Sequence, residues 1–235
     1  MGQYINLFRS TINSFCLYNE EIEKFFLNNY INRIYYHSKE QFIDSYHASQ
    51  NTIAYVNSSL FKMYATAMNG QEIFTGYLPC YSTMITLKTG DSLGKYMRSC
   101  GESTVYVADR SDYLRLLTSS EELTWHQLNE PYYRRNLNSL PLYESLNLSA
   151  REQTYIYILY LGLRLGTADE LHPEMLTAAY PPALKEVANY CGIHPNNISR
   201  YYNELRNKGI ISFSPKKLII FDINQLEQEI EELKK

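Results

Sequence analysis

The sequence lacks the features that mark several large classes of protein. Its four cysteines are scattered over 235 residues and none forms a C-x-x-C pair. This spacing argues against a structural zinc site or a disulfide scaffold and favours isolated reduced thiols. No apolar run approaches the ~20 residues that a bilayer-spanning helix needs, and the first residues lack the zones of a signal peptide. We therefore expect a cytoplasmic protein with no membrane segment, no metal and no cofactor.

A large excess of positive charge is also missing. The formal net charge is −3, so the whole molecule is not a polycation, and any nucleic-acid surface must be local. Hydrophobic residues make up 45% of the chain, which is enough for real cores. The 23 tyrosines suit both cores and interfaces, since each combines apolar area with one polar tip.

The N-terminal half changes its periodicity near residue 34. Residues 3–35 have helical spacing, and Asn19 is placed to cap a second helical piece. From residue 34 to 110, short β-rich runs alternate with turn signals, the strongest being Asn69-Gly70. The runs are TIAYV, SLFKMYATAM, EIFTGYL, YSTMITL and STVYVAD. Several such strands at short spacing predict a sandwich or barrel.

Helical patterns return after residue 110. Residues 112–165 are expected to be helical, with interruptions at Pro131 and Pro141 because proline disrupts a helix interior. The segment 151–166 predicts a helix that ends at Gly166, and residues 167–180 are expected to be a connector.

The sharpest pattern is PPALKEVANYCGIHPNNISRYYNELRNKGIISFSPKKLIIFD. LKEVANYC predicts a first helix, Gly192 permits a tight turn, and His194-Pro195 opens a second helix. The segment IISFSPKKLIIF then predicts a hairpin around a turn at residues 214–217, which is a wing. Together they predict a winged helix-turn-helix whose second helix enters a major groove.

The candidate DNA-binding residues share the outer face of the second helix and the tip of the wing. They are Asn196, Asn197, Ser199, Arg200, Lys216 and Lys217. Arginine can read guanine and asparagine can read adenine by paired hydrogen bonds. Residues 181–221 hold six basic and two acidic groups, 6 − 2 = +4, against −3 for the chain. Phosphate contact needs that local concentration of charge.

Less specific explanations stay open. Arg200 could contact a phosphate or pair with Glu204 within its helix, and His194 is expected to be a cap. The winged helix could be a protein-interaction module in a larger assembly. The barrel could hold a small-molecule enzyme, although His37 and His47 lie only near its start and no H-x-H pair occurs.

The order of parts resembles the CRP/FNR family of transcription regulators. LKEVANYCGIHPNNISRYYNELRNKGII resembles the family's helix-turn-helix signature, and the arginine of its recognition helix falls on Arg200. YVNSSLFKMYATAMNGQEIF resembles its barrel strand pair, with a serine near Ser58 in place of the usual glycine. Pro195, Asn196 and Asn197 replace the family's common Arg-Glu-Thr, so the glutamate that reads cytosine is missing and the half-site should differ.

The resemblance implies a homodimer formed through the helix after the barrel. It also allows comparison with the family's cyclic-nucleotide site, where an arginine pairs with the phosphate. Aligned on STVYVAD, that position falls near Leu93 or Gly94, and Arg98-Ser99 lies too close to the strand. We therefore expect no control by cyclic nucleotide, and no iron–sulfur cluster because clustered cysteines are absent. The effector is unknown; a thiol response at Cys80 or Cys100 stays open.

These observations combine into one expectation. The fold class is α+β, with a jelly-roll or cupin-like β-barrel, a dimerisation helix and a C-terminal winged helix-turn-helix. The expected domains are 1–115 for the N-terminal helix and barrel, 116–149 for the helical connector, and 150–235 for DNA binding. The expected partners are double-stranded DNA with a pseudo-palindromic operator, a second copy of the chain and RNA polymerase. No catalytic residue is expected.

Overall fold

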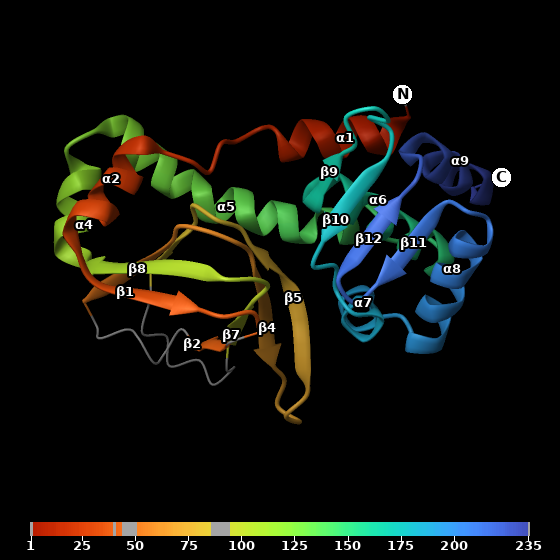
Figure 1. Ribbon diagram of the computed structural model, residues 1–235, viewed down its shortest axis with the longest axis horizontal. Coiled ribbons are helices and arrows are strands. Elements are labelled where there is room, and N and C mark those ends of the chain that lie inside the picture. The colour runs from red at the N-terminus through yellow and green to blue at the C-terminus, as the bar shows by residue number, and fades with distance from the viewer. Residues whose placement is uncertain (1, 40, 44–50, 86–94, 235) are drawn as a thin grey trace. The chain divides into compact units, whose positions relative to one another are not determined.

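The computed structural model describes residues 2–39, 41–43, 51–85 and 95–234 (Figure 1). The chain divides into two compact units. One unit is Cys16–Asn138, and the other combines Met1–Phe15 with Ser139–Lys235. The mixture of helices and sheets confirms the α+β fold class.

The unit Cys16–Asn138 contains two four-stranded antiparallel sheets, with strand orders β1-β8-β3-β6 and β2-β7-β4-β5. The strands of the first sheet are β1 (Tyr30–Tyr36), β8 (Ser103–Asp109), β3 (Thr52–Val56) and β6 (Thr83–Ile85). Those of the second are β2 (Gln41–Ile43), β7 (Lys95–Ser99), β4 (Phe61–Thr66) and β5 (Glu72–Leu78). One apolar core includes residues from both sheets, among them Val56, Phe61, Leu78, Met97 and Val105. The two sheets therefore pack face to face, as predicted.

Helices cover the other face of the first sheet. They are α2 (Glu20–Asn29) and α4 (Arg110–Thr118), together with the start of α5 (Glu121–Glu144). Phe26 of α2 stacks on Tyr55 of β3 with ring centroids 4.8 Å apart, and Tyr113 of α4 is fully buried beside them. Aromatic side chains thus supply much of the second core of this unit.

Local turn and cap signals were predicted correctly. The Asn19 side chain accepts hydrogen bonds from the backbone N–H groups of Glu21 and Ile22, both at 3.1 Å. Gly70 has a φ of 79° in the turn between β4 and β5. Near the expected glycine position, Ser59 adopts a φ of 69°, a left-handed conformation that glycine would adopt with less strain.

The predicted helical segment 3–35 is wrong beyond Asn29. Residues Tyr30–Tyr36 form β1 and pair antiparallel with β8, from Tyr30 opposite Ala108 to Tyr36 opposite Ser103. The segment YINRIYY is rich in aromatic and β-branched residues, which favour a strand. Pairing with β8, which is distant in sequence, therefore favours a strand over the helix that the spacing predicted.

The predicted interruptions at Pro131 and Pro141 are also wrong, because α5 continues through both. Its buried residues follow helical spacing: Leu123, Gln127, Glu130, Tyr133, Leu137 and Pro141. Polar bonds fix the same face. Gln127 Oε1 accepts from the Thr83 hydroxyl at 3.0 Å and also from the Tyr113 hydroxyl. Tertiary packing therefore offsets the backbone bonds that the two prolines cannot donate.

The second unit is built on α6 (Ala150–Leu165). A four-stranded sheet packs on it, with order β11-β12-β10-β9. Its strands are β9 (Gly166–Ala168), β10 (Leu176–Ala179), β11 (Ile211–Ser214) and β12 (Lys217–Ile220). The remaining helices are α1 (Gln3–Ile12), α7 (Leu184–Cys191), α8 (Pro195–Asn207) and α9 (Ile223–Leu233). The helix ending at Gly166 and the hairpin are confirmed; the connector 167–180 contains β9 and β10, which extend the wing.

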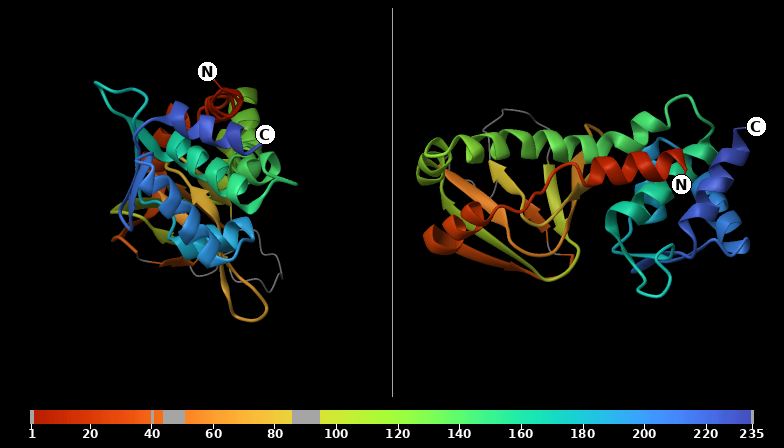
Figure 2. Two further views of the ribbon diagram at one scale, coloured as in Figure 1. Left: turned by 90° about the vertical axis from the view of Figure 1, so that its right-hand side faces the viewer. Right: turned by 90° about the horizontal axis from the view of Figure 1, so that it is seen from above.

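Helix α1 belongs to this second unit, which differs from the predicted grouping of the first helix with the barrel. Figure 2 shows α1 lying beside α6 and α9. Ile5 and Phe8 are fully buried, and the Phe8 ring meets Tyr160 of α6 edge-on at 5.2 Å. The apolar face of α1 is thus buried within the C-terminal unit.

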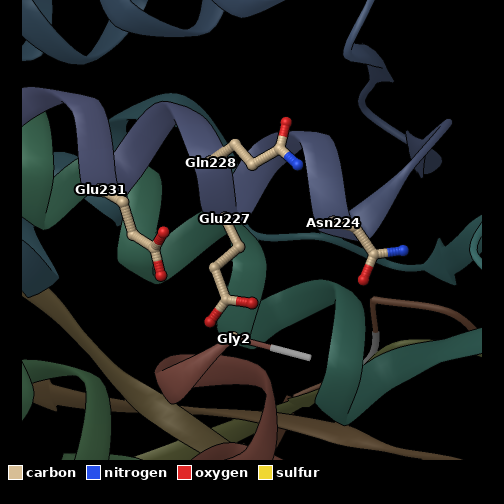
Figure 3. Close-up of a pocket in the computed structure, with 5 residues that line it drawn as sticks. All are labelled: Gly2, Asn224, Glu227, Gln228 and Glu231. Atoms are coloured by element: carbon tan, nitrogen blue, oxygen red, sulfur yellow. The ribbon is translucent and has the colours of Figure 1, made fainter.

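A carboxylate holds the start of α1. Glu227 of α9 is only 3% exposed, and its Oε1 accepts hydrogen bonds from the backbone N–H groups of Tyr4 at 2.7 Å and Ile5 at 3.0 Å. The N-terminus of a helix carries unpaired N–H groups and a partial positive charge, which a carboxylate satisfies. Gly2 lies so close to the Glu227 carboxylate that a Cβ at residue 2 would be 1.8 Å from Glu227 Oε2. Figure 3 shows Glu227 above Gly2 in a cavity of about 340 Å³ that Asn224, Gln228 and Glu231 complete.

We predict that Glu227→Ala destabilises the C-terminal unit by about 2–3 kcal/mol, because two buried N–H groups lose a charged acceptor. Hydrogen exchange of peptides from α1 and α9 should become faster, whereas peptides from β3 and β8 should keep their rates. Glu231→Ala is the matched control on the same helix, since Glu231 is exposed. Unchanged exchange in α1 of the Glu227 variant would contradict this role.

Candidate nucleic-acid interface

A tight turn sets the two helices of the motif. Helix α7 ends at Cys191, and Gly192 follows in the left-handed region with a φ of 67°. Space alone does not require glycine there, because no atom lies within 4 Å of an added Cβ. The backbone conformation requires it, as the sequence predicted.

Helix α8 begins as expected from its first residues. His194 is the N-cap, and its Nδ1 accepts a hydrogen bond from the Asn196 N–H at 3.3 Å. Pro195 occupies the first turn, where its missing N–H is no loss. The buried face consists of Ile198, Tyr201, Tyr202 and Leu205. This face fixes the helix to the unit and leaves the opposite face open.

The predicted site residues lie on that open face and at the hairpin tip. Asn196 and Arg200 are exposed, whereas Asn197 and Ser199 are half-buried. Lys216 and Lys217 are exposed at the turn between β11 and β12. Ser214 Oγ accepts from the N–H of Lys217 at 3.1 Å, which orders this turn.

The wing and α8 are joined by ring contacts. Tyr202 of α8 meets Phe213 of β11 edge-on at 5.1 Å, and the Arg206 guanidinium lies 5.6 Å from the Phe213 ring centroid. Lys208 forms an ion pair with Glu229 of α9. Two of the predicted local cations therefore have contacts within the unit, while the wing lysines project from an ordered turn.

Arg200 adopts the intrahelical arrangement that stayed open at the sequence level. Its guanidinium lies 4.8 Å from the Tyr201 ring centroid and donates to the Tyr201 hydroxyl at 2.9 Å. Its Nε is 3.8 Å from Oε1 of Glu204. The side chain is still 60% exposed, so it can leave this position to meet a ligand.

Glu204 has stronger partners on α6, which sequence reasoning missed. Its Oε2 accepts from Arg151 Nη2 at 2.8 Å and from the Tyr155 hydroxyl at 3.2 Å. Arg151 Nε also donates to that hydroxyl, at 3.3 Å. The recognition helix is thus tied to α6 by a charged cluster. Spacing in sequence gave no signal for it, because Tyr155 and Glu204 are 49 residues apart.

In the unit Cys16–Asn138, the structure describes only part of the region where the resemblance places a nucleotide site. The expected phosphate-binding positions, near Leu93 and Gly94, lie outside the described residues, as does His47. Arg98 forms an ion pair with Glu72 at 2.8 Å, and its guanidinium lies 5.0 Å and 5.2 Å from the ring centroids of Tyr64 and Tyr96. Arg98 therefore already has an acidic partner on the outer side of the neighbouring strands.

Other chemistry has little support in the part of the chain that the structure describes. No group of three or more His, Cys, Asp or Glu side chains there could hold a metal ion. Burial raises the pKa of Cys191 to about 12, and it also raises the pKa of Cys80. These two thiols are therefore neutral at ordinary pH. No helix among the described residues combines the length and apolar character needed to cross a membrane.

Comparison with known proteins agrees with this geometry. Residues 157–229 match the family model of the Crp-like helix-turn-helix domain. This part of the chain is a Crp-like helix-turn-helix domain. The match spans most of α6, the four strands of the wing sheet, α7, α8 and part of α9. No curated protein matches the chain in sequence.

Solved structures extend the likeness to most of the chain. A cyclic nucleotide-binding domain containing protein from Listeria monocytogenes has a TM-score of 0.64 at 14% identity, covering 95% of this chain and 99% of that one. A CRP-family transcriptional regulator from Thermus thermophilus has a TM-score of 0.63 at 14% identity, covering 84% and 96%. CprK complexed with OCPA has a TM-score of 0.60 at 11% identity, covering 88% and 94%. The chain therefore has the CRP/FNR regulator fold.

Proposed function

We propose that this protein is a sequence-specific DNA-binding transcription regulator of the CRP/FNR type that acts as a homodimer. The observation that carries the proposal is the Crp-like winged helix-turn-helix, whose recognition helix leaves one polar face open. Packing within the unit does not bury that face, because the buried side chains of α8 lie on the other side of the helix. Helices presented in this way read base edges in a major groove.

Each predicted site residue receives a role from its position. Asn196, Asn197, Ser199 and Arg200 face base edges, with Arg200 reading a guanine. Lys216 and Lys217 at the wing tip contact the phosphate backbone. Because Asn196 replaces the glutamate of the family's common Arg-Glu-Thr pattern, the half-site should differ from the family's commonest one.

An exposed apolar stripe on α5 supports the homodimer. Trp125, Leu128 and Tyr132 follow at spacings of three and four residues and are 58%, 62% and 67% exposed. Such a stripe resembles the seam by which two helices pair. A dimer also gives two recognition helices, which a specific site needs because one helix covers few base pairs.

The remaining parts of the proposal concern partners and control. We propose a pseudo-palindromic operator, contact with RNA polymerase, a cytoplasmic location and no catalytic activity. The protein does not answer to cyclic nucleotides, since Arg98 is engaged by Glu72 and the sequence offers Leu93 or Gly94 at the phosphate position. A buried cyclic phosphate needs a cation and donors to offset its desolvation.

We predict that Arg200→Ala weakens binding to the cognate operator by ~1–3 kcal/mol and relaxes preference at one base pair per half-site. Lys216→Ala should weaken cognate and random DNA alike and flatten the salt dependence. The measurement is a salt-dependent binding titration with an operator obtained by selection from random DNA. Equal losses on both DNAs for Arg200→Ala would make Arg200 a phosphate contact. A wild-type protein that binds no DNA would sink the proposal and favour a protein-interaction module.

We predict that the protein is a dimer at micromolar concentration and that Leu128→Glu weakens the dimer on the order of 100-fold, because it places a charge in an apolar seam. Sedimentation velocity measures the change. Leu171→Glu is the matched control, since Leu171 is 85% exposed but lies in the loop between β9 and β10. A wild-type protein that stays monomeric with and without DNA would disprove the dimer.

We predict that neither cyclic AMP nor cyclic GMP changes DNA affinity, because the expected phosphate partner is missing. Calorimetry with each nucleotide at millimolar concentration should give no saturable heat, and DNA titrations should superimpose. Saturable binding in the micromolar range that Arg98→Ala abolishes would show that Arg98 is the phosphate partner after all.

A further inference from the structure

Glu204 is the single acidic residue of the recognition helix α8. Its carboxylate lies one turn beyond Arg200, at the i,i+4 spacing at which opposite charges attract. An unneutralised carboxylate at this place would hold Arg200 against its own helix and would repel the phosphates of an approaching duplex. The neutralisation of Glu204 therefore bears directly on whether Arg200 can read a base.

The two oxygens of Glu204 are used differently. Oε2 receives Arg151 Nη2 at 2.8 Å and the Tyr155 hydroxyl at 3.2 Å, whereas Oε1 is 3.8 Å from Arg200 Nε. The first two distances are hydrogen bonds and the third is a longer ionic contact. Glu204 is thus bound to α6 and only loosely attracts Arg200.

The geometry of Arg151 is fixed from its own helix. Its Nε donates to the Tyr155 hydroxyl at 3.3 Å, and its guanidinium lies 5.7 Å from the Tyr155 ring centroid. Arg151 is 37% exposed and Glu204 31% exposed, so their pair is only partly screened by solvent. Arg200 is more exposed, at 60%, and its other partner is the Tyr201 hydroxyl, to which it donates at 2.9 Å.

We propose that Arg151 is a positioning residue for DNA recognition: it binds Glu204 from α6 and so releases Arg200 from its intrahelical pair for contact with a base. Arg151 and Arg200 share the charge of one carboxylate, Arg151 through Oε2 and Arg200 through Oε1. Because Arg151 takes most of that charge, moving Arg200 into the groove costs only a long ionic contact and the hydrogen bond to Tyr201. This inference rests on the proposed DNA-binding function and assigns a role to a residue outside the recognition helix.

The central test compares operator binding by the full-length protein and its Arg151→Ala variant. Without Arg151, Glu204 turns to Arg200, and an exposed ion pair of this kind is worth at most about fivefold in binding per half-site. For a dimer with two half-sites we expect a loss on the order of tenfold on the operator, with a smaller loss on random DNA. Arg115→Ala is the control, since it removes an exposed arginine that pairs with Asp112 of α4.

Two double variants separate positioning from mere stabilisation. Glu204→Gln in the Arg151→Ala background should restore operator affinity to within about twofold of Glu204→Gln alone, because no carboxylate remains to hold Arg200. In the Arg200→Ala background, Arg151→Ala should not reduce the preference for operator over random DNA, because only the repulsion of phosphates by Glu204 remains. A structural role of Arg151 would instead persist in both backgrounds and would overturn the proposal.

Tyr155→Phe provides a milder variant if Arg151→Ala does not fold. It removes only the hydroxyl that donates to Glu204 Oε2 and accepts from Arg151 Nε. We expect operator affinity to fall about twofold, and Glu204→Gln should cancel this loss as well. Unchanged operator affinity for both Arg151→Ala and Tyr155→Phe would overturn the proposal. Equal losses on operator and random DNA with a flatter salt dependence would also overturn it, because that pattern indicates a direct phosphate contact. A wild-type protein without operator preference would refute the proposed function instead.

Discussion

Helix α6 is buried around its whole circumference, and the C-terminal unit is arranged to cover it. Every residue from Thr154 to Gly162 is buried, so no side of the helix can face solvent. An apolar helix of this kind is stable in water only when other elements surround it. Helices α1, α8 and α9 pack against it together with β10 and β12. Gly162 allows the closest approach, since a Cβ there would lie 2.3 Å from Ile220 Cδ1.

The same helix carries polar groups at its N-terminal end, and these organise the recognition surface. Ser149 and Glu152 cap α6 reciprocally, which fixes where the helix begins. Arg151 in this first turn and Tyr155 one turn later contact Glu204 of α8. Packing of α6 therefore places charge as well as apolar area beside the recognition helix. The buried helix α6 and the exposed polar face of α8 are therefore linked through Glu204.

The features that could be predicted from the sequence are those decided by neighbours in the chain. The turn at Gly192, the cap at Asn19 and the start of α8 at His194 and Pro195 depend on a few adjacent residues. Features set by distant partners were missed: β1, which needs β8, the passage of α5 through Pro131, and the binding of Glu204 by Arg151. One signal was available. Glu227 interrupts the apolar face Ile223, Leu226 and Ile230 of α9, which marks it as a buried acceptor.

The docking of α1 has a consequence for synthesis on the ribosome. Helix α1 is made before α9, and the carboxylate that caps it comes 222 residues after Ile5. At about 5–20 residues per second, α1 waits on the order of 10 to 45 s for this partner. Tyr160 of α6, which contacts Phe8, is made earlier than Glu227, so apolar packing of α1 can begin before its N–H groups receive their acceptor. Helix α1 must therefore stay available until α9 emerges, because both belong to the same unit.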